Sequence, residues 1–362
     1  MKIGIDCHNL EGERTGSGRY SMNLLKYWAD EKGLIFILYF KSQIPGDIPE
    51  SKNFQTKILS SSSNAWFEHF LLPRAIQKDK INIFFSPSYI LPFTMPKNIK
   101  TAVAIHDISY EAHPEWYSLI NRILLRWISR KSAKKADIIF VPSEFTKSEI
   151  LKYYKIKPEN IFVISLAADN KFRDVGGETP YIKSKYRIKN KFIFYVGAIF
   201  NRRFVPQIIE AFKKIKNKLS HYQLLIGGPN YTRPFIDIKS EDSIIYINYI
   251  PEEDLAFLYN AADLFIWLSC YEGFGLPPLE AMASKTPVLS TKKTSLVEVL
   301  GDYPIWVENP EDIDEISEKM LKILSNEQLR NELIRKGLDQ AREFSWQKTA
   351  EEALKILINY AK

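Results

Sequence analysis

The sequence predicts an α/β protein made of two lobes, each with a doubly wound parallel sheet, and with a cleft between the lobes. Three observations lead to this prediction. The chain has 362 residues, which is more than one hydrophobic core usually supports. Short apolar runs alternate with helical patterns along both halves. Each half also carries a glycine-containing turn between an apolar run and a helix, where open α/β sheets bind ligands.

The first half, residues 1–172, begins with a strand at residues 3–6 and a loop at residues 7–18. That loop ends in Gly16-Ser17-Gly18, and a helix is expected to open at Arg19. Two glycines after a first strand can bring backbone amides close to a diphosphate. The third glycine and the acidic residue of a dinucleotide fingerprint are missing, so NAD is not implied. Further strands are expected at residues 34–40, 81–85, 101–105, 136–142 and 161–165, and further helices from residues 64, 119 and 143.

His106 and Asp107 directly follow the strand at residues 101–105. The carboxyl ends of strands are where open α/β sheets place their ligands, so His106 is well sited for chemistry. A histidine at this point is equally compatible with a loop residue that bonds to the backbone. Both interpretations stay open from the residues alone.

The predicted helix at residues 119–135 combines apolar positions at helical spacing with many Arg and Lys residues. We expect its apolar positions to pack on the first sheet and its basic side chains to be solvated. Solvated basic residues attract anionic lipids, so contact with a membrane surface is a further expectation.

Residues 170–190 are rich in charge and contain Gly176-Gly177 and Pro180, which is typical of a linker between lobes. The second lobe is therefore predicted to span residues 173–345, and the last helix, 346–362, to return to the first lobe. Strands are expected at residues 192–196, 223–226, 244–247, 264–268 and 288–290, and helices at 205–219, 252–261 and from 310 onward.

The most informative stretch follows the apolar run at residues 264–268. Glu272 and Glu280 are separated by seven residues, which begin with the turn residues Gly273, Phe274, Gly275 and Leu276. The turn amides can bind an anion at the positive end of the next helix. The two carboxylates can bind hydroxyls on either side of that anion. This layout suits a nucleotide-sugar site, although each feature taken singly is more often structural.

The whole string from Glu272 to Ala283 closely resembles the Glu-x7-Glu signature of retaining glycosyltransferases with the GT-B fold (glycosyltransferase family 4). Motifs in both halves extend the resemblance, those of the first half to the mannosyltransferase-B-like branch. They are Gly16-x-Gly18-Arg19-Tyr20, Trp66-x-Glu68, His106-Asp107, residues 141–146, Gly197 to Arg203, residues 261–265 and 294–299, and Glu343-Phe344-Ser345-Trp346.

The resemblance implies a role for each matching residue. Glu280 would bind the donor's ribose hydroxyls, and Glu272, helped by amides of the turn, would contact the transferred hexose. Arg202 and Arg203 would neutralise the diphosphate, whose charge grows as the glycosidic bond breaks. His106 would hydrogen-bond the hexose beside the reacting carbon. The remaining implied contacts are backbone: Gly16 and Gly18 at the phosphates, and residues near Tyr249 and Ile250 at the nucleotide base.

Two positions depart from the family pattern. Arg203 stands where the family usually has Lys, and Phe204 where it usually has Asn. Arginine can still bind phosphate, as a fork rather than a point charge.

The implied activity is that of a retaining, metal-independent hexosyltransferase. The favoured donor is GDP-mannose, and the acceptor is a hydroxyl of a growing cell-surface glycan or a lipid-linked saccharide. A UDP-sugar donor (glucosyl or N-acetylglucosaminyl) and a catalytically silent nucleotide-sugar-binding scaffold remain alternatives. No cofactor and no metal site are expected.

Composition indicates which partners and which cellular compartment to expect. The net charge of +7 suits anionic partners, but no nucleic-acid-binding motif accompanies it. Cys7 and Cys270 are far apart and have no partners at metal-ligand spacing, which favours a reducing compartment. A carboxylate at position 6 argues against a signal peptide, and no apolar run approaches the ~20 residues of a membrane span. We expect a cytoplasmic protein that can associate with the inner face of the cell membrane.

Overall fold

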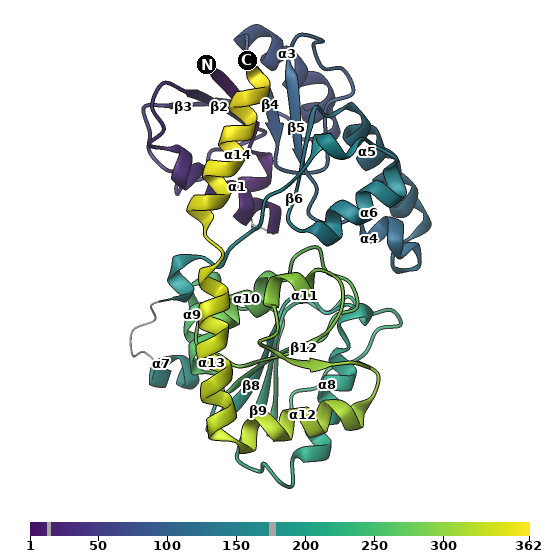
Figure 1. Ribbon diagram of the computed structural model, residues 1–362, viewed down its shortest axis with the longest axis vertical. Coiled ribbons are helices and arrows are strands. Elements are labelled where there is room, and N and C mark those ends of the chain that lie inside the picture. The colour runs from purple at the N-terminus through teal and green to yellow at the C-terminus, as the bar shows by residue number, and fades with distance from the viewer. Residues whose placement is uncertain (13–15, 174–178) are drawn as a thin grey trace. The chain divides into compact units, whose positions relative to one another are not determined.

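The computed structural model describes residues 1–12, 16–173 and 179–362 (Figure 1). Contacts divide the chain into two compact units. The first unit contains Met1–Leu166 and Ser345–Lys362, and the second contains Ala167–Phe344. The chain thus passes into the second unit after residue 166, where the sequence analysis placed the boundary after residue 172. The returning segment carries α14 (Trp346–Ala361).

The linker predicted at residues 170–190 is wrong. The described part of this stretch contains the short helix η5 (Asn170–Phe172) and α7 (Thr179–Lys185), and both belong to the second unit. Phe172 is buried, and its carbonyl accepts a hydrogen bond of 3.0 Å from Ser284. Lys185 pairs at 2.6 Å with the buried carboxylate of Asp254. The charges that suggested a solvated linker therefore bind this stretch to the unit. Gly176-Gly177 lie outside the described residues.

The first unit is built on a parallel sheet in the order β3-β2-β1-β4-β5-β6-β7. Strand order reverses between β1 and β4, and this switch point is where a doubly wound sheet opens a ligand site at its carboxyl edge. The strands are β1 (Lys2–Asp6), β2 (Ile35–Phe40), β3 (Phe54–Ile58), β4 (Ile83–Ser86), β5 (Lys100–Ala104), β6 (Ile138–Val141) and β7 (Ile161–Val163).

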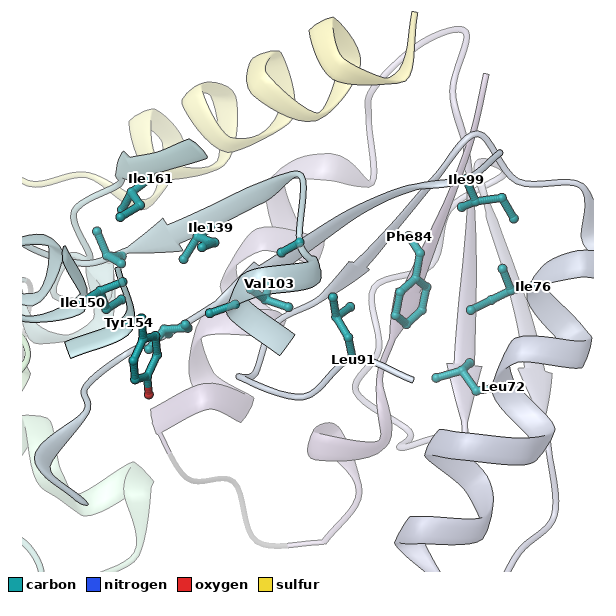
Figure 2. Close-up of a cluster of buried hydrophobic side chains, with 14 of the residues drawn as sticks. Leu72, Ile76, Phe84, Leu91, Ile99, Val103, Ile139, Ile150, Tyr154 and Ile161 are labelled. Atoms are coloured by element: carbon teal, nitrogen blue, oxygen red, sulfur yellow. The ribbon is translucent and has the colours of Figure 1, made fainter. Parts of the chain in front are cut away.

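Helices cover both faces of this sheet because successive strand residues point to opposite sides. On one face, Trp28 of α1 (Gly16–Trp28) stacks on Phe36 at 5.6 Å and donates to the Ala350 carbonyl of α14 at 2.9 Å. On the other face, a core cluster joins the sheet to α3 (Leu72–Asp79), α5 (Leu119–Lys135) and α6 (Glu144–Tyr154). Figure 2 labels Leu72, Ile76, Phe84, Leu91, Ile99, Val103, Ile139, Ile150, Tyr154 and Ile161 of this cluster.

The orientation predicted for the helix at residues 119–135 is also wrong. Five of its large apolar side chains are between 49% and 77% exposed: Leu119, Ile120, Ile123, Leu124 and Trp127. The buried face of α5 consists of Ser129, Ser132 and Ala133. Small residues allow close approach to the sheet, and neighbours satisfy their hydroxyls, since Tyr110 donates to Ser129 at 2.6 Å. Arg126 and Arg130, expected to be solvated, both pair with the buried Glu111 carboxylate, at 3.0 and 2.6 Å.

The second unit has a parallel sheet in the order β10-β9-β8-β11-β12-β13, which reverses between β8 and β11. Its strands are β8 (Lys191–Val196), β9 (Tyr222–Gly227), β10 (Ile244–Ile247), β11 (Leu264–Trp267), β12 (Val288–Thr291) and β13 (Ile305–Val307). Its longer helices are α8 (Val205–Ile215), α9 (Glu252–Ala261), α10 (Leu276–Ala283), α11 (Ser295–Leu300), α12 (Ile313–Ser325) and α13 (Glu327–Arg342). In the described ranges, no helix has the combined length and hydrophobicity that a membrane span requires.

Candidate active site

The turn after β11 lies at the switch point of the second sheet and is held in place by the start of α11. The Ser295 hydroxyl is within hydrogen-bond distance of two turn carbonyls, that of Glu272 at 2.8 Å and that of Phe274 at 3.0 Å. The Glu272 amide donates to Thr294 Oγ1 at 3.2 Å. Because these bonds fix the backbone on both sides of Gly273, the turn is preorganised before any ligand binds.

Gly275 ends the turn and caps α10. Its φ of +109° is one that L side chains rarely adopt, and a Cβ at this position would lie 2.6 Å from Leu296 Cδ2. Leu276 is the first residue of α10. The first amides of an α-helix have no intrahelical partner, so the start of α10 can bind an anion.

Arg203 lies beside this turn, in the loop that follows β8. Its Nε is 3.3 Å from Glu272 Oε1, and its Nη1 donates to the Ala198 carbonyl at 2.7 Å. The guanidinium lies 4.4 Å from the centre of the Trp267 ring. Burial lowers the pKa of Arg203, and the Glu272 carboxylate and Tyr195 hydroxyl raise the pKa by more, so the side chain stays charged.

The glycine at the end of β8 makes room for this arginine. Gly197 has a φ of +143°, and a Cβ there would lie 2.9 Å from the Trp267 ring and 3.1 Å from Arg203 Nη1. The charged guanidinium is thereby held at the switch point beside Glu272 and the Ala198 carbonyl, where an arginine fork suits an anion.

Arg202 and Phe204 flank Arg203 in the short helix η6 (Asn201–Arg203) and its cap. The Arg202 guanidinium lies 4.8 Å from the Phe200 ring centre, and the Arg202 carbonyl accepts a bond of 3.1 Å from the Cys270 amide of the β11 turn. A backbone hydrogen bond thus links the two loops of the switch point, the loop after β8 and the loop after β11. Phe204 has a φ of +50°, a left-handed conformation that Asn adopts more readily than Phe.

Glu280 lies one turn into α10 and is only 4% exposed. Tyr259 of α9 donates to its Oε2 at 3.1 Å. A buried carboxylate needs such donors, and this one sets the orientation of the side chain. Glu272 and Glu280 therefore differ in setting, since the first belongs to the turn beside Arg203 and the second to the helix interior.

In the first unit, His106 lies just beyond β5. Its Nε2 is 3.2 Å from the Pro87 carbonyl, which follows β4, and the Tyr20 ring meets it edge-on at 5.0 Å. Burial lowers the pKa of His106, so the imidazole is neutral near pH 7. A carbonyl can only accept, so the proton lies on Nε2, and Nδ1 is left as a hydrogen-bond acceptor.

Four other predicted positions are placed as follows. Gly16 and Gly18 lie in the first turn of α1, so the helix opens at Gly16 and not at Arg19 as predicted. Thr15, which precedes them, is outside the described residues. Tyr249 and Ile250 follow β10, the outermost strand on its side of the second sheet. Tyr249 is 58% exposed, whereas Ile250 is buried.

One functional candidate was missed by the sequence analysis. His8 follows β1 at the first switch point, and its Nδ1 lies 2.7 Å from Asp6 Oδ1. A carboxylate and a histidine two residues apart at the end of a buried strand are a signal that could have been noticed. Groups of three or more His, Cys, Asp or Glu side chains able to hold a metal ion do not occur in the described parts of the chain.

Comparison with known proteins finds glycosyltransferases that resemble this chain. The chain is 29% identical to O-antigen chain mannosyltransferase B of Escherichia coli, over 98% of both chains. It is 31% identical over 70% of its length to the serotype-specific mannosyltransferase WbdA of Escherichia coli, of which it covers 33%. Among solved structures, HepE of Anabaena in complex with UDP and glucose has a TM-score of 0.75 at 14% identity, with 99% of this chain and 100% of that chain covered.

The two parallel sheets and the likeness to HepE show the GT-B fold, with two Rossmann-like lobes. A model described as "Glycosyltransferase Family 4" matches residues 14–171, and one described as "Glycosyl transferases group 1" matches residues 180–340. The chain belongs to glycosyltransferase family 4, with mannosyltransferases of O-antigen synthesis among its relatives.

Proposed function

We propose that this glycosyltransferase moves a mannosyl group from GDP-mannose, with retention of anomeric configuration, to a hydroxyl of a growing cell-surface glycan or lipid-linked saccharide. The observation that carries the proposal is the pairing of Arg203 with Glu272 at the second switch point, 3.3 Å apart. An arginine fork suits the diphosphate of a nucleotide sugar, and the adjacent carboxylate suits sugar hydroxyls. The mannosyltransferase relatives favour mannose over glucose or N-acetylglucosamine.

The proposed mechanism needs no protein nucleophile. Arg202 and Arg203, with the amides at the start of α10, would stabilise the charge that develops on the leaving diphosphate. Glu272 would accept from hydroxyls of the hexose, and Glu280, oriented by Tyr259, from the ribose. The acceptor hydroxyl would attack the anomeric carbon on the face that the diphosphate leaves, and would lose its proton to the departing phosphate oxygen. His106 Nδ1 would accept from a sugar hydroxyl.

The donor is tested by thermal-shift titration with GDP, UDP and ADP, followed by product analysis with GDP-mannose, UDP-glucose and UDP-N-acetylglucosamine. We expect GDP to raise the melting temperature most, because a ligand that binds only the folded state stabilises it by mass action. We expect an α-linked mannosyl product. If UDP raised the melting temperature most and a UDP-sugar were the donor used, the donor would be a UDP-sugar and not GDP-mannose. Nucleotide binding with no transfer from any donor would favour a catalytically silent scaffold.

Metal independence is part of the proposal, because the arginines can supply the positive charge that a divalent ion would otherwise provide. We expect transfer to continue in EDTA at an unchanged rate. Loss of transfer in EDTA with recovery on adding Mg²⁺ or Mn²⁺ would overturn the assignment of Arg202 and Arg203 as the diphosphate ligands.

We further propose that α5 places the first lobe against an anionic membrane surface, at the inner face of the cell membrane. Its exposed apolar residues, led by Ile120 at 77%, form one side of the helix, and large exposed apolar patches mark interaction sites. Trp127 and Phe93, edge-on at 5.2 Å, are amphipathic-interface residue types, and Lys131 lies 4.7 Å from the Trp127 ring centre. The unpaired state of Cys7 and Cys270 fits a reducing compartment.

The membrane contact is tested by sedimentation with vesicles of phosphatidylglycerol and phosphatidylcholine. Ile120→Ser with Ile123→Ser should reduce binding at any salt concentration, and Lys131→Glu with Lys134→Glu should reduce it mainly at low salt. Lys213→Glu with Lys218→Glu, in the second lobe, is the matched control. Equal binding by all variants, or none by the unmodified protein, would leave this face without a membrane role.

A further inference from the structure

At the first switch point, one imidazole lies between two nearly buried carboxylates. His8 Nδ1 is 2.7 Å from Asp6 Oδ1, and His8 Nε2 is 3.6 Å from Glu68 Oε1. The side chains of Asp6, His8 and Glu68 are 4%, 16% and 8% exposed. Asp6 ends β1 and also accepts from the His8 amide at 3.2 Å, so the backbone fixes both groups. Ionised carboxylates are rarely buried to this degree unless they are paired.

Glu68 reaches this position from a distant element through an unusual turn. It lies in η2 (Phe67–Leu71), a π-helical turn between α2 (Asn64–Trp66) and α3. Single π turns inside helices occur frequently at functional sites, because the extra residue redirects side chains. The Phe67 ring meets His8 edge-on at 5.6 Å and closes the apolar side of the cluster.

The cluster has unused capacity to accept hydrogen bonds. Asp6 is occupied by the amide and ring of His8, whereas the Glu68 carboxylate makes no hydrogen bond within residues 1–12, 16–173 and 179–362. Asp6 raises the pKa of His8 to about 9 against the effect of burial, so the imidazole is charged at neutral pH. Two carboxylates around one imidazolium leave the cluster with negative charge above the pKa of Glu68.

We propose that Asp6, His8 and Glu68 bind a hydroxyl of the saccharide acceptor, with Glu68 as the accepting group and with His8, fixed by Asp6, holding Glu68 in place. This inference rests on the proposed function, because it assigns the acceptor of that same reaction. A neutral hydroxyl can donate to Glu68, whereas an anionic diphosphate is repelled by the carboxylates. A protonated imidazole is no metal ligand, which disfavours a cation at this position.

The electrostatic surroundings predict how binding depends on pH. Burial, followed by Asp6, raises the pKa of Glu68 to about 7, and His8 and Lys41 oppose that rise. Tyr89 also interacts with Glu68, because burial, then Asp107 and then Glu68 raise the pKa of its hydroxyl. Acceptor affinity should therefore rise as pH increases through 7, because ionised Glu68 is the stronger acceptor of a hydroxyl hydrogen bond.

The test is a histidine-ring NMR titration of the full chain, which has five histidines. Methyl α-mannoside, methyl α-glucoside and N-acetylglucosamine are the probes, with a donor thermal shift recorded on the same samples. We expect the chemical shift of the His8 ring to change saturably with at least one saccharide. The affinity for that saccharide should be lower at pH 6 than at pH 8. Glu68→Gln should weaken that affinity by about 10- to 100-fold, as for loss of a charge-assisted hydrogen bond.

Asp79→Asn is the matched control, because Asp79 is another nearly buried, ion-paired carboxylate of the first lobe. It should lower the melting temperature and leave the saccharide affinity unchanged. If the His8 signal does not respond to any saccharide, or responds equally in Glu68→Gln, the inference is overturned. If instead no nucleotide binds and no donor is consumed, the proposed function fails, whatever His8 shows.

Discussion

Gly275→Ala should destabilise the second lobe and weaken nucleotide binding together, because this glycine forms the end of the donor turn. The new Cβ would lie 2.6 Å from Leu296 Cδ2, and the backbone φ is +109°. Leu296 is fully buried and cannot move into solvent. A left-handed backbone costs an L residue about 1–2 kcal/mol, and forcing a methyl group into a packed site costs about 1–3 kcal/mol.

Two further variants separate the cost of the left-handed backbone from the cost of the steric overlap with Leu296. Gly33 has a φ of +78° with nothing within 4 Å of its would-be Cβ, so Gly33→Ala carries the backbone cost alone. Leu296→Ala combined with Gly275→Ala removes the overlap and keeps the backbone cost. We expect Gly275→Ala to cost about 3 kcal/mol, which for a lobe of this size lowers the melting temperature by about 6–12 °C.

The assay is scanning calorimetry of Gly33→Ala, Gly275→Ala, Leu296→Ala and the double variant, with GDP affinity measured on each by thermal-shift titration. The double variant should lose less stability than the sum of the losses in Gly275→Ala and Leu296→Ala, because neighbouring sites couple. GDP affinity should fall in Gly275→Ala and stay normal in Gly33→Ala. Strict additivity in the cycle, or normal GDP binding by Gly275→Ala, would refute the steric argument for this turn.

Four further outcomes follow from the geometry. Glu280→Gln should raise the donor KM by about tenfold with kcat nearly kept, because a ribose contact is uniform binding; a normal KM with a collapsed kcat would reject that role. His106→Ala should lower kcat and leave GDP affinity intact, and equal loss of both would show a structural residue. Phe204→Asn should raise stability by about 1 kcal/mol, since φ is +50° there, and an unchanged melting temperature would contradict this. His8 contributes stability in full below its unfolded pKa of about 6.5 and loses it as pH rises through 9. Between pH 7 and 9.5 the wild type should therefore lose about 2.4 kcal/mol that His8→Gln does not, as measured by denaturation at several pH values.

The turn after β11 could be read from the sequence because its pattern is local. Glu272, the turn glycines and Glu280 lie within nine consecutive residues, and the helix start that they surround follows from Pro277 and the apolar positions after it. The predicted strands of both sheets were confirmed for the same reason, as short apolar runs. The strands β3 and β13 were missed, since Phe-Gln-Thr-Lys-Ile and Ile-Trp-Val at the sheet edges show no long apolar run.

The errors concern features that depend on the partner of a segment. The apolar stripe of α5 was recognised, but periodicity cannot say which side of a helix meets the sheet. The burial of Ser129 and Ser132 depends on partners from other segments, because Tyr110 and Tyr154 bond to the Ser129 hydroxyl and the Leu91 amide donates to Ser132 Oγ. Likewise Glu68 lies 60 positions from His8, and their proximity depends on sheet order and on a π-helical turn. Neither can be read from spacing.

The two switch points differ in charge, and this difference limits what each can bind. In the second lobe the loops after β8 and β11 present Arg202, Arg203 and a helix start, a positive surface suited to a diphosphate. In the first lobe the end of β1 presents Asp6, and His8 and Glu68 lie beside it, a surface suited to neutral hydroxyls. Similar sheets would therefore select different substrates through the side chains at their carboxyl edges. This difference in local charge supports the proposal that the donor binds to the second lobe and the acceptor to the first.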